Sequence, residues 1–263
     1  MLTCGVDIGA RTIDIALFDG AQILESRVVD TGAFPRKNAM DAFENILQTA
    51  GVTRSDIERT VATGYGRNYF DEADRAATEI LCHARGVAYL IPSVRTIIDI
   101  GGQDSKMIEV GEGGKVLNFA MNDRCAAGTG KFIEIVANTL NIQLEETGKA
   151  VQGVTEICEI SSMCAVFAES EIIGLLHKGV SPEVILRGVF RSVARRTLGM
   201  AGKVGLRNDI IFTGGVARNE GVLQALKQEI GNDNIKVPPE PQITGALGAA
   251  IIAMEDLHLE RSK

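Results

Sequence analysis

The sequence has few prolines, no long apolar run and no excess of basic residues. Only 6 of its 263 residues are proline, and this otherwise ordinary composition excludes collagen-like and disordered classes. No apolar run reaches the roughly 18 residues that a membrane-spanning helix needs, so we expect no membrane partner. The 27 Lys and Arg residues against 34 Asp and Glu give a net charge of −7. That charge argues against a nucleic-acid partner, because phosphate backbones bind a basic face.

The N-terminus and the cysteines favour a cytoplasmic protein. The first residues, MLTCGVDIGA, have no basic segment before an apolar stretch, so they do not form a signal-peptide pattern. The five cysteines are an odd number without any C-x2-C spacing. We therefore expect thiols or metal ligands and no disulfide framework.

Two stretches of the sequence resemble each other. Residues 4–19 and 97–110 each combine β-branched residues, an Asp-Ile-Gly tripeptide, a short polar turn and an alternating apolar run. This pattern predicts two β-hairpins, with further strands at 21–29 and 115–120. The equivalent acids, Asp7 and Asp99, are 92 positions apart, which indicates two related domains and no solenoid of short repeats.

The remaining periodicity predicts an α/β fold in two lobes. Apolar residues at helical spacing predict helices at 38–50, 72–90, 127–140, 165–178, 182–204, 221–230 and 244–254. Short strands are expected at 155–160, 210–213 and 236–239. We expect an N-terminal lobe at 1–93 and a C-terminal lobe at 94–243, with a last helix at about 244–263 packing back on the first lobe.

Both predicted hairpin tips have the composition of a phosphate-binding site. Glycine and hydroxyl residues leave backbone N–H groups open to phosphate oxygens, and a neighbouring Asp can hold Mg²⁺. These residue types are Asp7, Gly9, Arg11 and Thr12 in the first tip, and Asp99, Gly101, Gly102 and Ser105 in the second. One copy alone could be a simple turn, whereas two copies favour binding. The Walker pattern Gly-x4-Gly-Lys-[Ser/Thr] is absent.

With a third motif, IFTGGVARN at 211–219, the sequence resembles the actin–hexokinase–Hsp70 ATPase superfamily. The resemblance implies an actin-like ATPase (ribonuclease H-like) fold, in which two duplicated lobes enclose a cleft for Mg·ATP or ADP. It implies that Asp7 and Asp99 order Mg²⁺ through water, and that Gln103 or Asp104 orients the attacking water; turn-forming polarity is the alternative for that pair. The implied nucleotide contacts are Asp7, Gly9, Ala10, Arg11, Thr12, Asp99, Gly101, Gly102, Gln103, Asp104, Ser105, Lys131, Glu134, Gly214, Gly215, Asn219 and Gly245.

Two further segments resemble a smaller family. MNDRCAAGTGKFIE at 121–134 and SSMCAVFAESE at 161–171 are similar to the activators of 2-hydroxyacyl-CoA dehydratases and to benzoyl-CoA reductase ATPase subunits. The likeness implies a homodimer that shares one [4Fe–4S] cluster, with Cys125 and Cys164 of each protomer as ligands. Both cysteines begin a predicted helix, whose dipole favours the thiolate. The residues alone favour zinc or buried structural cysteines, since 39 positions separate the pair.

The resemblance also implies an ATP-hydrolysing one-electron donor. A reduced ferredoxin or flavodoxin would supply the electron, a 2-hydroxyacyl-CoA dehydratase would receive it, and the protein would be sensitive to oxygen. The alternatives are an ATPase subunit of a benzoyl-CoA-reductase-type or double-cubane-cluster system, a sugar or acetate kinase of the same fold, and a nucleotide-gated scaffold. Of the other cysteines, we expect Cys4 and Cys82 to pack in the interior and Cys158 to lie in a strand-like run.

Overall fold

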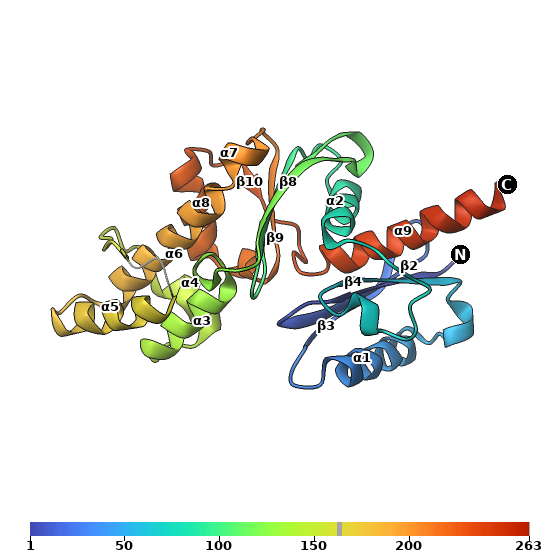
Figure 1. Cartoon of the computed structure of the whole chain (residues 1–263), viewed down its shortest axis with the longest axis horizontal. Coiled ribbons are helices and arrows are strands. Elements are labelled where there is room, and N and C mark those ends of the chain that lie inside the picture. Colours follow the sequence, from blue (N-terminus) through green and yellow to red (C-terminus); the bar gives the residue numbers. More distant parts are fainter. Residues whose placement is uncertain (162–164, 263) are drawn as a thin grey trace. The chain divides into compact units, whose positions relative to one another are not determined.

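The computed structural model describes residues 1–161 and 165–262. The chain divides into two compact units, each built on a five-stranded sheet with helices against it (Figure 1). The first unit comprises Met1–Arg95, Val110–Asn118 and Pro238–Lys263, and the second comprises Thr96–Glu109 and Phe119–Val237.

The first unit is organised around the first hairpin. Its sheet has the order β3-β2-β1-β4-β5, with β1 antiparallel to β2 and parallel to β4. The strands are β1 (Thr3–Ile8), β2 (Thr12–Phe18), β3 (Ile23–Asp30), β4 (Arg59–Gly64) and β5 (Arg75–Ala76). The helices are α1 (Pro35–Ala50), α2 (Glu79–Leu90) and α9 (Thr244–Arg261), with short 3-10 turns at Arg54–Asp56, Arg67–Tyr69 and Glu112–Gly114.

Helices cover both faces of this sheet, so its central strands are apolar on both sides. Side chains of β1 and β2 such as Val6 and Ile15 pack against Phe43 of α1, whereas Ala16 and Phe18 pack against α9. Every residue of β1 is buried, as expected for a strand between two helical layers. Figure 1 shows α1 and α9 on opposite sides of these strands.

Glycines allow α2 and α9 to approach closely. A Cβ at Gly248 of α9 would lie 1.7 Å from the carbonyl oxygen of Cys82, and one at Gly86 of α2 would lie 2.0 Å from that of Thr244. Neither position can accept a methyl group unless the helix backbones move apart. This contact holds α9 in the first unit, although 153 residues lie between the end of α2 at Leu90 and the start of α9 at Thr244.

We expect Gly248→Ala to destabilise the first unit by about 1–3 kcal/mol, the usual cost of overpacking. The reason is the short approach to the Cys82 carbonyl, and the measurement is urea unfolding of the full chain. The matched control is Gly202→Ala, also in a helix, where an added Cβ meets nothing within 4 Å. Equal unfolding midpoints for the two variants would contradict the close packing.

The second unit repeats the arrangement with the order β10-β9-β6-β7-β8, β6 being antiparallel to β7 and parallel to β9. The strands are β6 (Thr96–Ile100), β7 (Ser105–Val110), β8 (Val116–Asn122), β9 (Ile210–Thr213) and β10 (Ile235–Lys236). The helices are α3 (Gly130–Thr139), α4 (Thr147–Ala150), α5 (Ala165–His177), α6 (Pro182–Leu198), α7 (Ala201–Val204) and α8 (Glu220–Ile230). Short 3-10 turns lie at Ala126–Gly128, Leu144–Glu146 and Gly215–Arg218. Helices α3, α5, α6 and α8 share one apolar core with β6 and β9.

The structure confirms both predicted hairpins and the short strand at 210–213. It also confirms that Cys4 and Cys82 are buried, and burial raises the pKa of the Cys82 thiol to about 12. No helix in the part of the chain that the structure describes is long and apolar enough to cross a membrane.

Several predicted segments have the wrong extent or type. The strand expected at 236–239 is only Ile235–Lys236, and the helix expected at 127–140 begins at Gly130. The helix expected at 72–90 begins only at Glu79, because residues before it pair with the edge of β4, Asp74 N–H donating to Thr60 O (2.9 Å) and Ala77 N–H to Ala62 O (2.9 Å). The helix expected at 182–204 is interrupted after Leu198, where the turn tightens and Gly199 N–H donates to two carbonyls. Residues 155–160 form no strand; the backbone at Cys158 instead packs against Gly188 of α6.

Candidate functional site

The first hairpin presents its backbone at a fixed turn. Gly9 N–H donates to Thr12 O (2.9 Å) and so closes the tip. The hydroxyl of Thr31 donates to Gly9 O (2.8 Å) and fastens the tip to the chain after β3. Ala10 and Arg11 are exposed, whereas Gly9 and Thr12 are half-buried. The arrangement suits an anion that approaches the tip from solvent.

Asp7, at the base of this tip, lies in a space that two glycines keep open. A Cβ at Gly64 would be 2.4 Å from Asp7 Oδ1, and a Cβ at Gly245 would be 2.1 Å from Asp7 Oδ2. Gly64 also has a φ of +81°, a conformation that L-residues other than glycine rarely adopt. The predicted residue Gly245 therefore belongs beside the Asp7 carboxylate. Gly64 was missed as a site residue.

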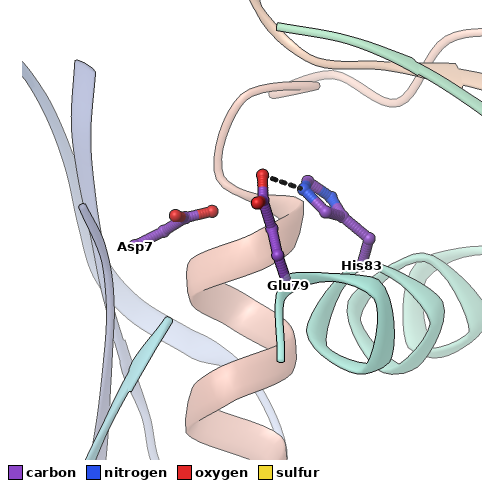
Figure 2. Close-up of side chains that lie close together, drawn as sticks. All are labelled: Asp7, Glu79 and His83. Carbon is purple, nitrogen blue, oxygen red and sulfur yellow. Dashed lines mark ion pairs between the residues drawn. The ribbon is translucent and has the colours of Figure 1, made fainter. Parts of the chain in front are cut away.

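Two more residues missed by sequence reasoning, Glu79 and His83, lie beside Asp7 (Figure 2). They are four positions apart on α2, and His83 Nε2 is 3.6 Å from Glu79 Oε1. His83 Nδ1 is 3.0 Å from the hydroxyl of Thr244, the first residue of α9. The available signal was the i,i+4 spacing at the start of a helix, which puts both side chains on one face.

The second hairpin has the same backbone form, but a lysine, Lys106, lies opposite its equivalent acid Asp99, where the first hairpin has Asp14 opposite Asp7. Gly101 N–H donates to Asp104 O (3.0 Å) and closes the tip. Lys106, only 1% exposed, donates to Asp99 Oδ2 (3.1 Å) and lies 2.9 Å from Asp104 Oδ2. The other Asp99 oxygen accepts from the hydroxyl of Thr213 (2.8 Å). Both oxygens of Asp99 thus have protein partners, a feature that the motif did not predict.

The two residues predicted to orient water occupy different environments. Gln103 is exposed at the hairpin tip, whereas Asp104 is 7% exposed and paired with Lys106. Ser105, the next residue, is buried, and among the described residues its hydroxyl has no hydrogen-bond partner.

The first two N–H groups of helix α3 are hydrogen-bonded to carbonyl oxygens of the second hairpin tip. Gly130 N–H donates to Gly101 O (2.9 Å), and Lys131 N–H donates to Gly102 O (2.8 Å). The side chains of Lys131 and Glu134 form an ion pair at 3.2 Å. The start of α3, with Lys131, therefore lies against this tip.

Cys125 does not begin an α-helix, contrary to the prediction. It precedes a 3-10 turn of three residues, and α3 starts only at Gly130, so the helix-dipole argument does not apply to this thiol. Asn122 holds the segment in place, its Oδ1 accepting from Cys125 N–H (3.2 Å) and its amide donating to Cys125 O (2.9 Å). Cys125 is half-buried, and Cys164 lies outside the described residues.

The third motif repeats a detail of the first unit. Thr63-Gly64 ends β4 beside Asp7, and Thr213-Gly214 ends β9 beside Asp99. Gly214 has a φ of +86°, and a Cβ there would lie 2.4 Å from Ile100 O. The duplication thus includes a Thr-Gly pair as well as a hairpin.

Asn219, at the end of this motif, caps α8. Its Oδ1 accepts from Gly221 N–H (3.0 Å) and Val222 N–H (3.2 Å), and its amide donates to the Thr147 hydroxyl (2.9 Å). Gly215, four positions before Asn219, is exposed. Beyond the cap a cavity of about 330 Å³ opens between residues 148–154, α6 and α8.

Comparisons with known proteins agree over the whole chain. Residues 4–253 match the BadF/BadG/BcrA/BcrD ATPase family. An activator of lactoyl-CoA dehydratase from Anaerotignum propionicum is 46% identical over 256 residues, which cover 97% of this chain and 98% of that protein. Two solved structures are similar to this chain over nearly its whole length, with 39–41% sequence identity.

Component A of (R)-2-hydroxyglutaryl-CoA dehydratase from Acidaminococcus fermentans has a TM-score of 0.94 and 41% identity, covering 98% of this chain and 99% of its own. The activator of the 2-hydroxyisocaproyl-CoA dehydratase from Clostridium difficile, with bound ADPNP, has a TM-score of 0.92 and 39% identity, covering 100% and 97%. The chain therefore belongs to the BadF/BadG/BcrA/BcrD ATPase family, and it is an ATPase with the actin-like fold that the resemblance implied.

Proposed function

We propose that this ATPase is an iron–sulfur one-electron donor that activates a 2-hydroxyacyl-CoA dehydratase. The support is that relatives 39–46% identical over nearly the whole chain are named as activators or components of such dehydratases. In this proposal the protein acts in the cytoplasm as a homodimer. A reduced ferredoxin or flavodoxin supplies the electron, and ATP hydrolysis drives its transfer to the dehydratase at low potential.

Each unit contributes proposed nucleotide contacts, from its hairpin tip and, in the second unit, also from the third motif. The backbone at Gly9, Ala10, Arg11 and Thr12 holds phosphate oxygens in the first unit. In the second unit the phosphate residues are Gly101, Gly102, Gln103 and Ser105, with Lys131 and Glu134 nearby at the start of α3. The residues proposed to flank the adenosine are Gly214, Gly215 and Asn219.

Magnesium fits the Asp7 side of this site. Mg²⁺ prefers carboxylates, phosphates and retained water molecules, and any side chain at positions 64 or 245 would collide with the Asp7 carboxylate. Asp99 fits only as a ligand through water, because Lys106 and Thr213 already bind its two oxygens. Bound Mg²⁺ would neutralise charge on the phosphates.

We assign different roles to the two residues that were candidates for orienting water. Gln103, exposed at the tip, is the residue that orients the attacking water. Asp104 acts through Lys106, which it holds at 2.9 Å, and it is a positioning residue.

The half-buried thiol of Cys125 fits an iron–sulfur cluster at the protein surface. Thiolates are the ligands that such clusters take, and Asn122 fixes the backbone that carries this one. With Cys164 and the same pair from a second protomer, the donor set reaches the four that a [4Fe–4S] cluster requires. The bound cluster supplies one electron at low potential.

The observation that carries the proposal is the bonding of the second hairpin tip to α3. Gly101 and Gly102 accept hydrogen bonds from Gly130 and Lys131, which follow Cys125 by five and six residues. A change at the tip when phosphate binds or leaves is therefore transmitted through two backbone hydrogen bonds to the segment that holds the cysteine. ATP turnover and the cysteine environment are coupled within one unit.

The test is anaerobic purification followed by iron and sulfide analysis and a dehydratase assay. We expect about four iron and four sulfide per dimer, and activation of a purified 2-hydroxyacyl-CoA dehydratase that requires ATP and a reductant. Replacing ATP by ADPNP should abolish sustained activation. An iron-free monomer that hydrolyses ATP or phosphorylates a sugar would overturn the proposal in favour of a scaffold or a kinase.

A further inference from the structure

We propose that Asp7, Glu79 and His83 bind a divalent transition-metal ion in the first unit without any nucleotide. The three side chains come from β1 and from one face of α2, and they converge as Figure 2 shows. Asp7 is 5% exposed and His83 is 4% exposed, while the Glu79 side chain is 21% exposed. Most of the surface of all three side chains is thus shielded from solvent.

The distances suit a common ligand. One ligand atom from each residue lies within 4.8 Å of the other two, and Glu79 Oε1 is 3.6 Å from His83 Nε2. Nitrogen and oxygen ligands lie about 2.0–2.2 Å from an ion such as Zn²⁺, so two of them on the same ion are at most twice that distance apart. Small side-chain rotations bring all three atoms into range.

Thr244 orients the imidazole as a metal ligand. Its hydroxyl is directed to the carbonyl of Pro241 (3.4 Å), so its oxygen can accept a hydrogen bond from His83 Nδ1 (3.0 Å). When an ion is bound, Thr244 holds the proton on Nδ1, and Nε2, the atom that faces Glu79, gives its lone pair to the ion. Metal-binding histidines are typically held through their other ring nitrogen in this way.

The duplicated hairpins support a cation in the first unit. Asp14 is the residue opposite Asp7 in the β1–β2 ladder, and both are buried acids. At the equivalent position of the second hairpin, Lys106 lies opposite Asp99. The second unit therefore has a lysine where the first unit has Asp14, and in the first unit the carboxylate of Glu79 and the imidazole of His83 also lie beside Asp7.

The donor set selects the class of ion. Mg²⁺ takes oxygen ligands and retains water, whereas imidazole together with carboxylates suits Mn²⁺, Fe²⁺ or Zn²⁺. The ion is thus chemically distinct from the Mg²⁺ that accompanies ATP, although Asp7 is near both. The inference concerns the nucleotide-free chain and does not depend on the proposed dehydratase partner.

The experiment adds Mn²⁺ alone to chelator-treated, nucleotide-free protein. Free Mn²⁺ is measured by electron paramagnetic resonance, and pulsed spectra detect coupling to a histidine nitrogen. We expect one bound ion per chain with nitrogen coupling. In His83→Gln the coupling should disappear and the affinity should fall at least about tenfold, with a similar loss of affinity in Glu79→Gln.

The control variant is His258→Gln, which changes an exposed histidine on α9 and should leave Mn²⁺ binding unchanged.

Thr244→Val should weaken Mn²⁺ binding about 10–100-fold, the usual effect of losing an outer-shell partner, and Thr244→Ser should restore it. If the His83 variant does not fold, the two Thr244 variants test whether His83 is a metal ligand. Binding of Mn²⁺ only in the presence of ADP, or without nitrogen coupling, would overturn the inference. Separate measurement of ADPNP binding shows whether the nucleotide site itself has failed.

Discussion

Cys125→Ala should remove the iron–sulfur cluster and abolish electron transfer while ATP hydrolysis continues. Each protomer of the proposed dimer supplies two thiolates, so this variant loses two of the four ligands that the cluster needs. Iron and sulfide should fall from about four of each per dimer to nearly none, and the visible absorption should disappear. The nucleotide residues of both units are unchanged in this variant, so slow ATP hydrolysis is retained.

The matched control is Cys158→Ala. Cys158 Sγ donates to Val184 O (3.5 Å), and burial raises the pKa of this thiol above its ordinary value. It is therefore a packing residue, and its variant should keep the full iron content and the ATP-dependent activation of the dehydratase. Retention of iron in Cys125→Ala, or loss of iron only in Cys158→Ala, would show that the ligand assignment is wrong.

The hairpins could be predicted from the sequence because their signals are local. Asp-Ile-Gly between β-branched runs specifies a strand end and a tight turn, and the second copy at Asp99 made the duplication visible. The different charges of the residues opposite the two hairpin acids, Asp14 in the first unit and Lys106 in the second, could also have been predicted from the sequence. Asp14 follows Asp7 by seven positions, as Lys106 follows Asp99, and hairpin register places each pair side by side.

The surroundings of Asp7 could not be predicted in the same way. Gly64, His83 and Gly245 come from three different elements. The pairing of β1 with β4 brings Gly64 to the Asp7 carboxylate, and the packing of α2 and α9 adds His83 and Gly245. The prediction that a helix begins at Cys125 was wrong for a related reason. Gly130 binds the hairpin tip, so the helix starts at that contact and not at the cysteine.

Lys106→Met should strongly destabilise the second unit. Lys106 is 1% exposed and lies within 3.1 Å of both Asp99 and Asp104. Methionine has a similar length but no charge, so the two buried acids would lose the cation that they share in this unit. Breaking a buried ion pair from one side costs about 3–5 kcal/mol, which urea unfolding measures directly.

Lys131→Met is the control for charge removal in the same unit. Its partner Glu134 lies at a comparable 3.2 Å, but the Lys131 side chain is 45% exposed, and exposed pairs contribute at most about 1 kcal/mol. The two variants therefore separate burial from charge. If Lys106→Met costs no more than Lys131→Met, then Asp99 and Asp104 do not need the lysine for stability. In that case the charge difference between the two hairpins would make no contribution to the stability of the second unit.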